Sequence, residues 1–142
     1  MPQHFNKLGV SFQYPDNWTL DEHDALAGRP SVTVYSPGGG FWSVSIHPAH
    51  LDPARLAKAA LKAMRDEYPL LEEERVRETI AEHSMIGYDL NFYYLDLTNT
   101  AAIRCLRTPR ASYVIFFQAE DRELHSVKAV FHAITTSLVR AL

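Results

Sequence analysis

The chain has 142 residues, of which 46% are hydrophobic and 11% aromatic, and its formal net charge is −3 at pH 7. This length and apolar content predict that residues 1–142 form a single folded domain and exclude an intrinsically disordered segment. The negative charge argues against nucleic-acid binding, because domains that bind nucleic acid through phosphate contacts usually carry a basic face.

The compartment is predicted from what the chain lacks. It contains one cysteine, Cys105, so no internal disulfide can form. Residues 1–10 lack the apolar run of a signal peptide, and no stretch approaches the roughly 20 apolar residues of a membrane span. We therefore expect a cytoplasmic protein without a membrane span.

The N-terminal region predicts short strands separated by turns. Residues 10–14, VSFQY, alternate apolar and polar side chains as a half-buried strand does, and Pro15 ends the strand because it has no N–H to donate. Asp16 and Asn17 favour a turn, after which Trp18 opens the next strand. The aromatic residues beside this turn are predicted to point into the core and not to form a binding site.

A hairpin is predicted around the glycine run at residues 37–40, PGGG. Val32 and Val34 alternate before it, and Trp42, Val44 and Ile46 alternate after it. A phosphate-binding loop is disfavoured, because the run lacks a following Lys-Ser/Thr pair and precedes a strand instead of a helix.

Two helices are predicted. Residues 52–68 begin with Asp52 as the N-cap and Pro53 at the first helical position. The apolar stripe of this helix consists of Leu56, Ala60, Met64 and Tyr68. Residues 121–142 form the second helix, capped by Asp121. Its apolar face consists of Leu124, Val127, Phe131, Ile134, Leu138 and Leu142.

Four further strands are predicted between and after these elements, at residues 74–82, 85–97, 100–107 and 112–118. The strand at 112–118 is apolar on both faces, which is typical of a central strand. The order of elements predicts an α+β domain, with an antiparallel sheet of about six to eight strands covered by the two main helices.

Three segments carry a resemblance to a known group of domains. The opening GVSFQYPDNW at 9–18, the strand SYVIFF at 112–117 and the helix segment FHAITTSL at 131–138 resemble PsbP-like domains. That group includes a photosystem accessory protein, a Ran-binding nuclear-import factor and bacterial proteins of largely unassigned role. The resemblance implies a PsbP-like α/β/α sandwich and a binding or accessory role. It supplies no catalytic residue.

The residues themselves give no signature of an enzyme. His47 and His50 are the candidate metal ligands, but Pro48 constrains their loop and Asp52 is required as the helix cap. Cys105 lies in a predicted strand and is expected to be a buried thiol. We therefore expect no catalysis and no cofactor. The alternative is an enzyme or a protein for a small ligand or metal, with its site near His47, His50 and Arg104.

The strand at 85–97 points instead to a partner protein. Tyr88, Phe92 and Tyr94 lie on one face, while Tyr93 and Leu95 lie on the other. The apolar side chains on both faces must be shielded from water, and the two helices of the domain can do this by packing on one face each. Otherwise an apolar patch is left for a protein, a lipid-like ligand or a second copy of the chain. The predicted partner-binding residues are Tyr93, Leu95 and Trp42.

Overall fold

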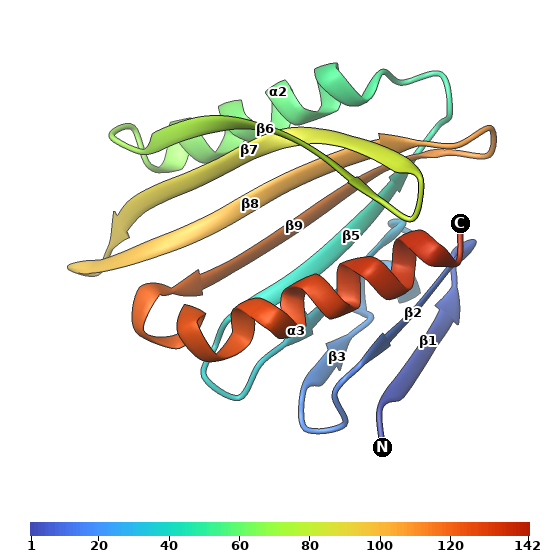
Figure 1. Cartoon of the computed structure of the whole chain (residues 1–142), viewed down its shortest axis with the longest axis horizontal. Coiled ribbons are helices and arrows are strands. Elements are labelled where there is room, and N and C mark those ends of the chain that lie inside the picture. The colour runs from blue at the N-terminus through green and yellow to red at the C-terminus, as the bar shows by residue number, and fades with distance from the viewer.

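The computed structural model describes residues 1–142 and contains nine strands and three helices (Figure 1). The elements are β1 (Gln3–Lys7), β2 (Val10–Tyr14), β3 (Thr19–Asp21), α1 (His23–Leu26), β4 (Ser31–Tyr35), β5 (Phe41–His47), α2 (Pro53–Glu67), β6 (Glu72–Ile80), β7 (His83–Tyr94), β8 (Leu97–Arg107), β9 (Ser112–Glu120) and α3 (Asp121–Arg140). Seven strands form one antiparallel sheet in the order β3-β4-β5-β9-β8-β7-β6, while β1 and β2 form a separate hairpin. The predicted α+β fold class is confirmed.

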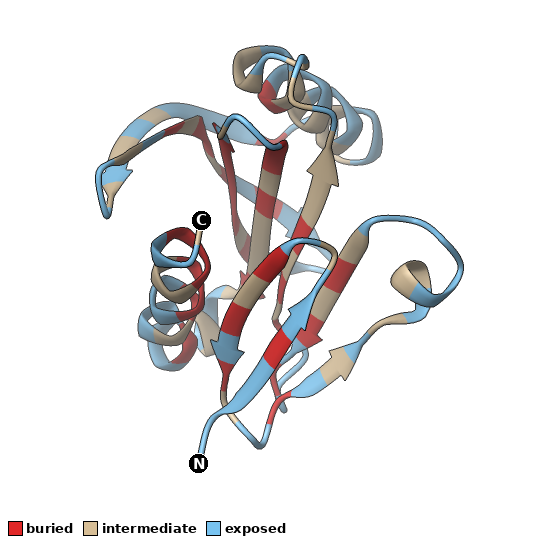
Figure 2. Ribbon diagram, turned by 90° about the vertical axis from the view of Figure 1, so that its right-hand side faces the viewer, coloured by how far each residue is buried: buried red, intermediate tan, exposed pale blue.

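The seven-stranded sheet has a core on each face. Helix α2 packs on one face, where it covers β7, β8 and β9. Helix α3 and the β1–β2 hairpin pack on the other face, as Figures 1 and 2 show. The core on the α3 side holds 20 buried residues, and the core on the α2 side holds eight. Strands β8 and β9 therefore lie between two apolar layers, which explains why β9 is apolar on both faces.

The two main helices form where the sequence predicts them. Asp52 caps α2 by accepting a hydrogen bond from the Ala54 amide, and Pro53 occupies the first helical position. In α3 the buried residues include Val127, Phe131 and Ile134 from the predicted apolar face. The cap of α3 is corrected by one position, because Glu120, not Asp121, accepts the hydrogen bond from the Arg122 amide.

The turns on either side of β7 shift the predicted strand boundaries. Residues 81–82 and 95–96 form two-residue turns, and all four residues have positive φ. Positive φ at both central positions matches the twist of a hairpin but normally selects Asn and Gly. Leu95 was predicted to lie in a strand but occupies such a turn, with φ of 51°. The absence of Asn or Gly there conceals the turn in the sequence.

The glycine run lies in the predicted hairpin between β4 and β5, and this hairpin binds the side-chain carboxylate of Glu123. Glu123 of α3 accepts a hydrogen bond from the Gly40 amide at 2.8 Å and another from the Ser36 hydroxyl. A Cβ atom at Gly38 or Gly40 would lie within 2.8 Å of this carboxylate. The small residues therefore let the hairpin turn dock on the start of α3.

Tyr14 and Trp18 both point into the core on the α3 side, as predicted. The strands beside their turn do not pair with each other. Strand β2 pairs only with β1, whereas β3 begins the seven-stranded sheet. The turn thus connects two layers of the domain, and Trp18 packs edge-on against Phe131 of α3 with ring centroids 5.8 Å apart.

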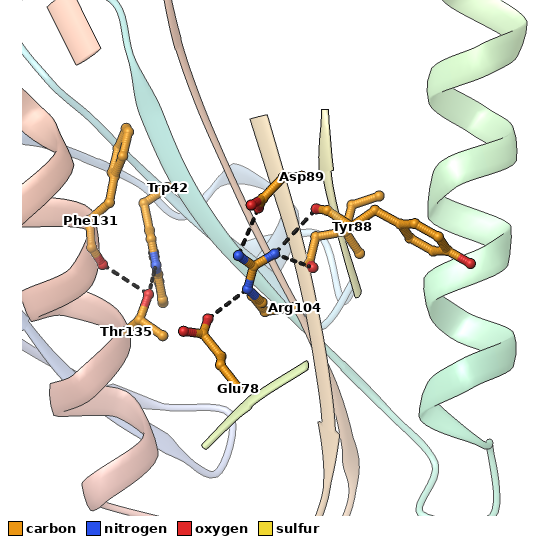
Figure 3. Close-up of polar contacts among 8 residues, drawn as sticks. Trp42, Glu78, Tyr88, Asp89, Arg104, Phe131 and Thr135 are labelled. Carbon is orange, nitrogen blue, oxygen red and sulfur yellow. Dashed lines mark hydrogen bonds and ion pairs between the residues drawn. The ribbon is translucent and has the colours of Figure 1, made fainter. Parts of the chain in front are cut away.

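A buried hydrogen bond joins α3 to the sheet and yields a stability prediction. Thr135 Oγ1 accepts from the Trp42 indole N–H at 3.0 Å and donates to the Phe131 carbonyl at 2.8 Å (Figure 3). Thr135→Val leaves the indole N–H unpaired in the core and should lower the free energy of unfolding by about 1–3 kcal/mol. Urea unfolding followed by tryptophan fluorescence measures this loss.

The neighbouring Thr136 provides the matched control. Its Oγ1 is buried and has no hydrogen-bond partner. Thr136→Val therefore removes an unsatisfied group and should leave stability unchanged or raise it by less than about 1 kcal/mol. Equal losses in the two variants would contradict the assignment of the Trp42–Thr135 hydrogen bond.

Candidate functional site

The main exposed apolar feature is the end of the β7–β8 hairpin, which we call the hairpin tip and define as residues 93–97. Strand β6 begins at Glu72, opposite Asn91, and β9 ends at Glu120, opposite Asn99. The hairpin therefore extends past both neighbouring strands. The exposed apolar residues of the tip are Tyr93 (74% exposed), Tyr94 (49%), Leu95 (77%) and Leu97 (37%).

The base of the hairpin tip is held against α2. Tyr68, at the end of α2, stacks on Phe92 with ring centroids 4.3 Å apart and meets Tyr94 edge-on at 6.1 Å. Burial, and then the Glu67 carboxylate, raise the pKa of Tyr68. Its hydroxyl thus stays neutral at physiological pH, and the aromatic contacts fix the direction in which the tip projects.

Arg104 occupies a different place, at the base of a cleft of about 330 Å³ between α3 and strands β6 to β8. It is only 6% exposed. Its guanidinium donates to Glu78 at 2.6 Å, to Asp89 at 2.7 Å and to the carbonyls of Tyr88 and Ile103 (Figure 3). Because these contacts are all to the protein itself, Arg104 connects β6, β7 and β8 and leaves little donor capacity for a ligand.

The structure separates Arg104 from His47, two of the three residues of the alternative site. His47 follows Ser43 and Ser45 on the α2 face of β5, because Trp42 and Val44 fill the core on the α3 side. Arg104 lies on the opposite face, since its neighbours Ile103 and Cys105 belong to the core on the α2 side. One site that joins His47 to Arg104 is therefore excluded, and a site at the loop of His47 and His50 alone stays a prediction.

No group of three or more His, Cys, Asp or Glu side chains is arranged to hold a metal ion. His47 instead makes a 2.9 Å hydrogen bond between its Nε2 and the hydroxyl of Ser45. Burial lowers the pKa of His47, which favours the neutral ring at physiological pH. His50 lies exposed in the loop before α2.

Trp42 also requires a correction. It was predicted to contact a partner, but its side chain is fully buried between β2 and α3 and contacts Phe12 with ring centroids 4.9 Å apart. Because strand residues alternate between faces, the neighbouring Phe41 lies on the α2 face, half-buried, and stacks with Phe116. Trp42 is therefore part of the core.

Comparisons with known proteins identify the fold. No family model and no curated protein sequence matches the chain. The solution structure of cyanobacterial PsbP (CyanoP) from Synechocystis aligns with a TM-score of 0.64 at 15% identity, covering 96% of this chain and 90% of that one. The chain has the PsbP/Mog1p-like fold.

Two further solved structures share this PsbP/Mog1p-like fold. The Ran-binding protein Mog1p from Saccharomyces cerevisiae aligns with a TM-score of 0.61 at 9% identity, covering 99% of this chain and 94% of that one. PA94 from Pseudomonas aeruginosa, described as a putative regulator of unknown function, aligns with a TM-score of 0.61 at 11% identity, covering 96% and 95%. In the present chain no helix is long and apolar enough to cross a bilayer.

Arg104 yields a prediction about stability. Arg104→Lys keeps the positive charge, but one ammonium cannot satisfy four acceptors on three strands. The free energy of unfolding should fall by about 1–3 kcal/mol. Arg107→Lys, on the exposed end of the same strand, should change it by less than about 0.5 kcal/mol. Chemical denaturation measures the free energy of unfolding of both variants. Similar losses in the two would contradict the proposal that Arg104 connects the three strands.

Cys105 yields a prediction about reactivity. The side chain is fully buried, and this burial raises the pKa of its thiol to about 12, whereas an exposed thiol has a pKa of about 8.5. We expect no labelling of the folded protein by a thiol reagent at mildly alkaline pH, and complete labelling in urea. Mass spectrometry of the labelled chain measures this. Fast labelling of the folded protein would contradict the buried, protonated state.

Proposed function

We propose that the chain is a non-catalytic binding domain that acts on a partner protein through the hairpin tip. One observation supports this most strongly. Leu95 is 77% exposed and has a φ of 51°, so one residue combines an apolar side chain in water with an unfavourable backbone conformation. The left-handed region costs about 1–2 kcal/mol for an ordinary residue. Such strain is concentrated at functional sites.

The other two-residue turns show that the exposed leucine is not required by the geometry. The β1–β2 turn also holds a leucine with positive φ, but Leu8 packs against the core and is followed by Gly9. The β6–β7 turn uses Ala81 and Glu82, which expose no large apolar side chain. Only at the hairpin tip are strain and apolar exposure combined, and aromatic residues flank that position as they do in interface hot spots.

The fold neighbours agree with this class of function. Mog1p is described as Ran-binding, so at least one protein of this fold is a protein-binding protein. The two hydroxyl groups that line the Arg104 cleft, those of Thr100 and Thr135, donate hydrogen bonds within the chain, and the one thiol is buried. We therefore propose an accessory or chaperone-like role carried out by binding alone.

The test is a tagged pull-down from the native cell, quantified by mass spectrometry, beside light scattering on the purified chain. The wild type should retain one partner in stoichiometric amount, and Tyr93→Ser should lose it. Truncating a central aromatic residue typically costs about 2 kcal/mol or more of binding, or roughly thirtyfold in Kd. Leu26→Ser is the control, because Leu26 is 81% exposed in α1 and lies outside the tip.

A second pair of variants separates folding from binding. Leu95→Asn with Asp96→Gly installs the preferred turn residues and should raise stability by up to about 1 kcal/mol while abolishing capture of the partner. Ala81→Asn with Glu82→Gly changes the other turn in the same way and should leave capture intact. The proposal fails if the tip variants retain the partner, or if the wild type is a monomer that captures nothing.

A further inference from the structure

A second surface lies beside α2, on the side of the helix that faces β6. Strand β6 is the edge strand of the sheet. A groove of about 360 Å³ runs between α2 and β6–β7, with Ala57, Ile86 and Tyr88 among its apolar lining. Its charged lining residues are Lys58, Arg75 and Arg77, and no acidic residue lines it. We call this the basic groove.

The three cations of the basic groove form no ion pair within the chain. The chain as a whole has 17 acidic and 14 basic residues. Without the groove the remaining charge is 11 − 17 = −6, so the surrounding protein is acidic while the groove carries +3. A local field of this sign attracts anionic groups.

The groove is open because α2 covers β7, β8 and β9 but leaves β6 largely uncovered. Arg75 is paired with Tyr88 and Arg77 with Ile86, so both arginines project on the α2 face of the sheet. Alternate residues of a strand lie about 6.6–7 Å apart on one face. Two anionic groups with the same spacing, on a second extended chain, therefore match the two guanidinium groups.

The edge of β6 offers the backbone partner for such a chain. β6 is the last strand of the sheet, so its outer N–H and C=O groups are unpaired by any other strand (Figure 1). It is nine residues long, which is sufficient for strand addition. Its other face carries Glu74 and Glu78, whereas Glu73 on the face of the arginines is paired with Arg65, so the two faces of the edge have opposite charge.

A second copy of the chain does not fit this edge when the two β6 strands pair over their full length. Antiparallel pairing of two β6 strands over their full length places Arg75 opposite Arg77 and Glu74 opposite Glu78, each twice. Like charges directly opposite one another destabilise strand pairing. The charges therefore disfavour this full-length pairing of two β6 strands and favour a strand with the complementary pattern.

We propose that β6 accepts an extended segment of a partner protein that carries acidic side chains at alternate positions. The segment pairs with the β6 backbone, and its acidic side chains enter the basic groove to contact Arg75, Arg77 and Lys58. This surface is separate from the hairpin tip, and the proposal does not depend on the function assigned to the tip.

The experiment uses the full chain and fluorescent peptides as long as β6. The first peptide alternates Glu with Thr, and the second has the same composition with all Glu residues at one end. By fluorescence anisotropy, the alternating peptide should bind at least about tenfold more tightly, since only it matches the strand spacing. Methylation of its pairing N–H groups should abolish binding, and added salt should weaken it.

Two matched variants locate the site. Arg77→Glu should weaken binding of the alternating peptide about tenfold or more, because it reverses one charge contact. Arg110→Glu changes the net charge equally at the β8–β9 turn, outside the groove, and should have little effect. Amide chemical-shift changes along β6 should accompany binding to the wild type, and Tyr93→Ser should bind the peptide normally.

Several outcomes overturn the proposal. Equal affinity for the two peptides, equal effects of the two charge reversals, or displacement by inorganic phosphate as readily as by the peptide would show a simple anion site. Dimerisation of the wild type through β6, abolished by Arg77→Glu, would show a second copy as the occupant. Absence of peptide binding would show that the charged edge only prevents aggregation.

Discussion

The need to cover both faces of one wide antiparallel sheet determines the rest of this structure. Strands lie about 4.8 Å apart, so seven of them span roughly 29 Å, whereas a helix is about 10–12 Å across. One helix therefore covers two or three strands. On one face α2 covers β7, β8 and β9, and on the other α3 is supplemented by the β1–β2 hairpin. The central strands β8 and β9 are buried on both faces as a result.

The surfaces with functional potential are the parts of the sheet that these layers leave uncovered. The hairpin tip extends past both neighbouring strands, and α2 leaves β6 largely uncovered. The Arg104 cleft arises where α3 crosses the sheet at a distance from β6 to β8. The buried cation of this cleft, unlike the arginines of the basic groove, is already paired. Arg104 is paired with Glu78 and Asp89, while Arg75 and Arg77 form no ion pair within the chain.

Local chemistry explains which elements the sequence predicts well. Three features can be recognised from neighbouring residues or from a single repeat of apolar side chains. They are the Asp52–Pro53 start of α2, the apolar face of α3 and the apolar run of β9. The turn at Leu95 was missed because its residues are not those such a turn prefers. The fold class followed from the order of elements, since antiparallel hairpins with two amphipathic helices leave few arrangements.

The site required information that no local pattern holds. The alternation of side chains along β5 places Trp42 on the same face as Val44. It does not reveal that the β1–β2 hairpin covers that face of the sheet. Arg104 meets Glu78 and Asp89 across 26 and 15 residues of chain, and only the strand register brings the three together. The basic groove likewise joins Lys58 of α2 to two arginines of β6. Such contacts depend on pairing, which periodicity within one strand does not specify.

Helix α2 relates the two proposed surfaces to each other. Tyr68 at its end holds the base of the hairpin tip, and Lys58, ten residues earlier, lines the basic groove. Ten residues of helix span about 15 Å. An interface of standard size buries about 800 Å² on each partner, which is a patch roughly 30 Å across. One partner can therefore contact both surfaces. The apolar tip would then contribute most of the affinity and the groove the orientation and the salt-dependent rate of association, because buried aromatic residues dominate binding energy whereas charges steer encounter.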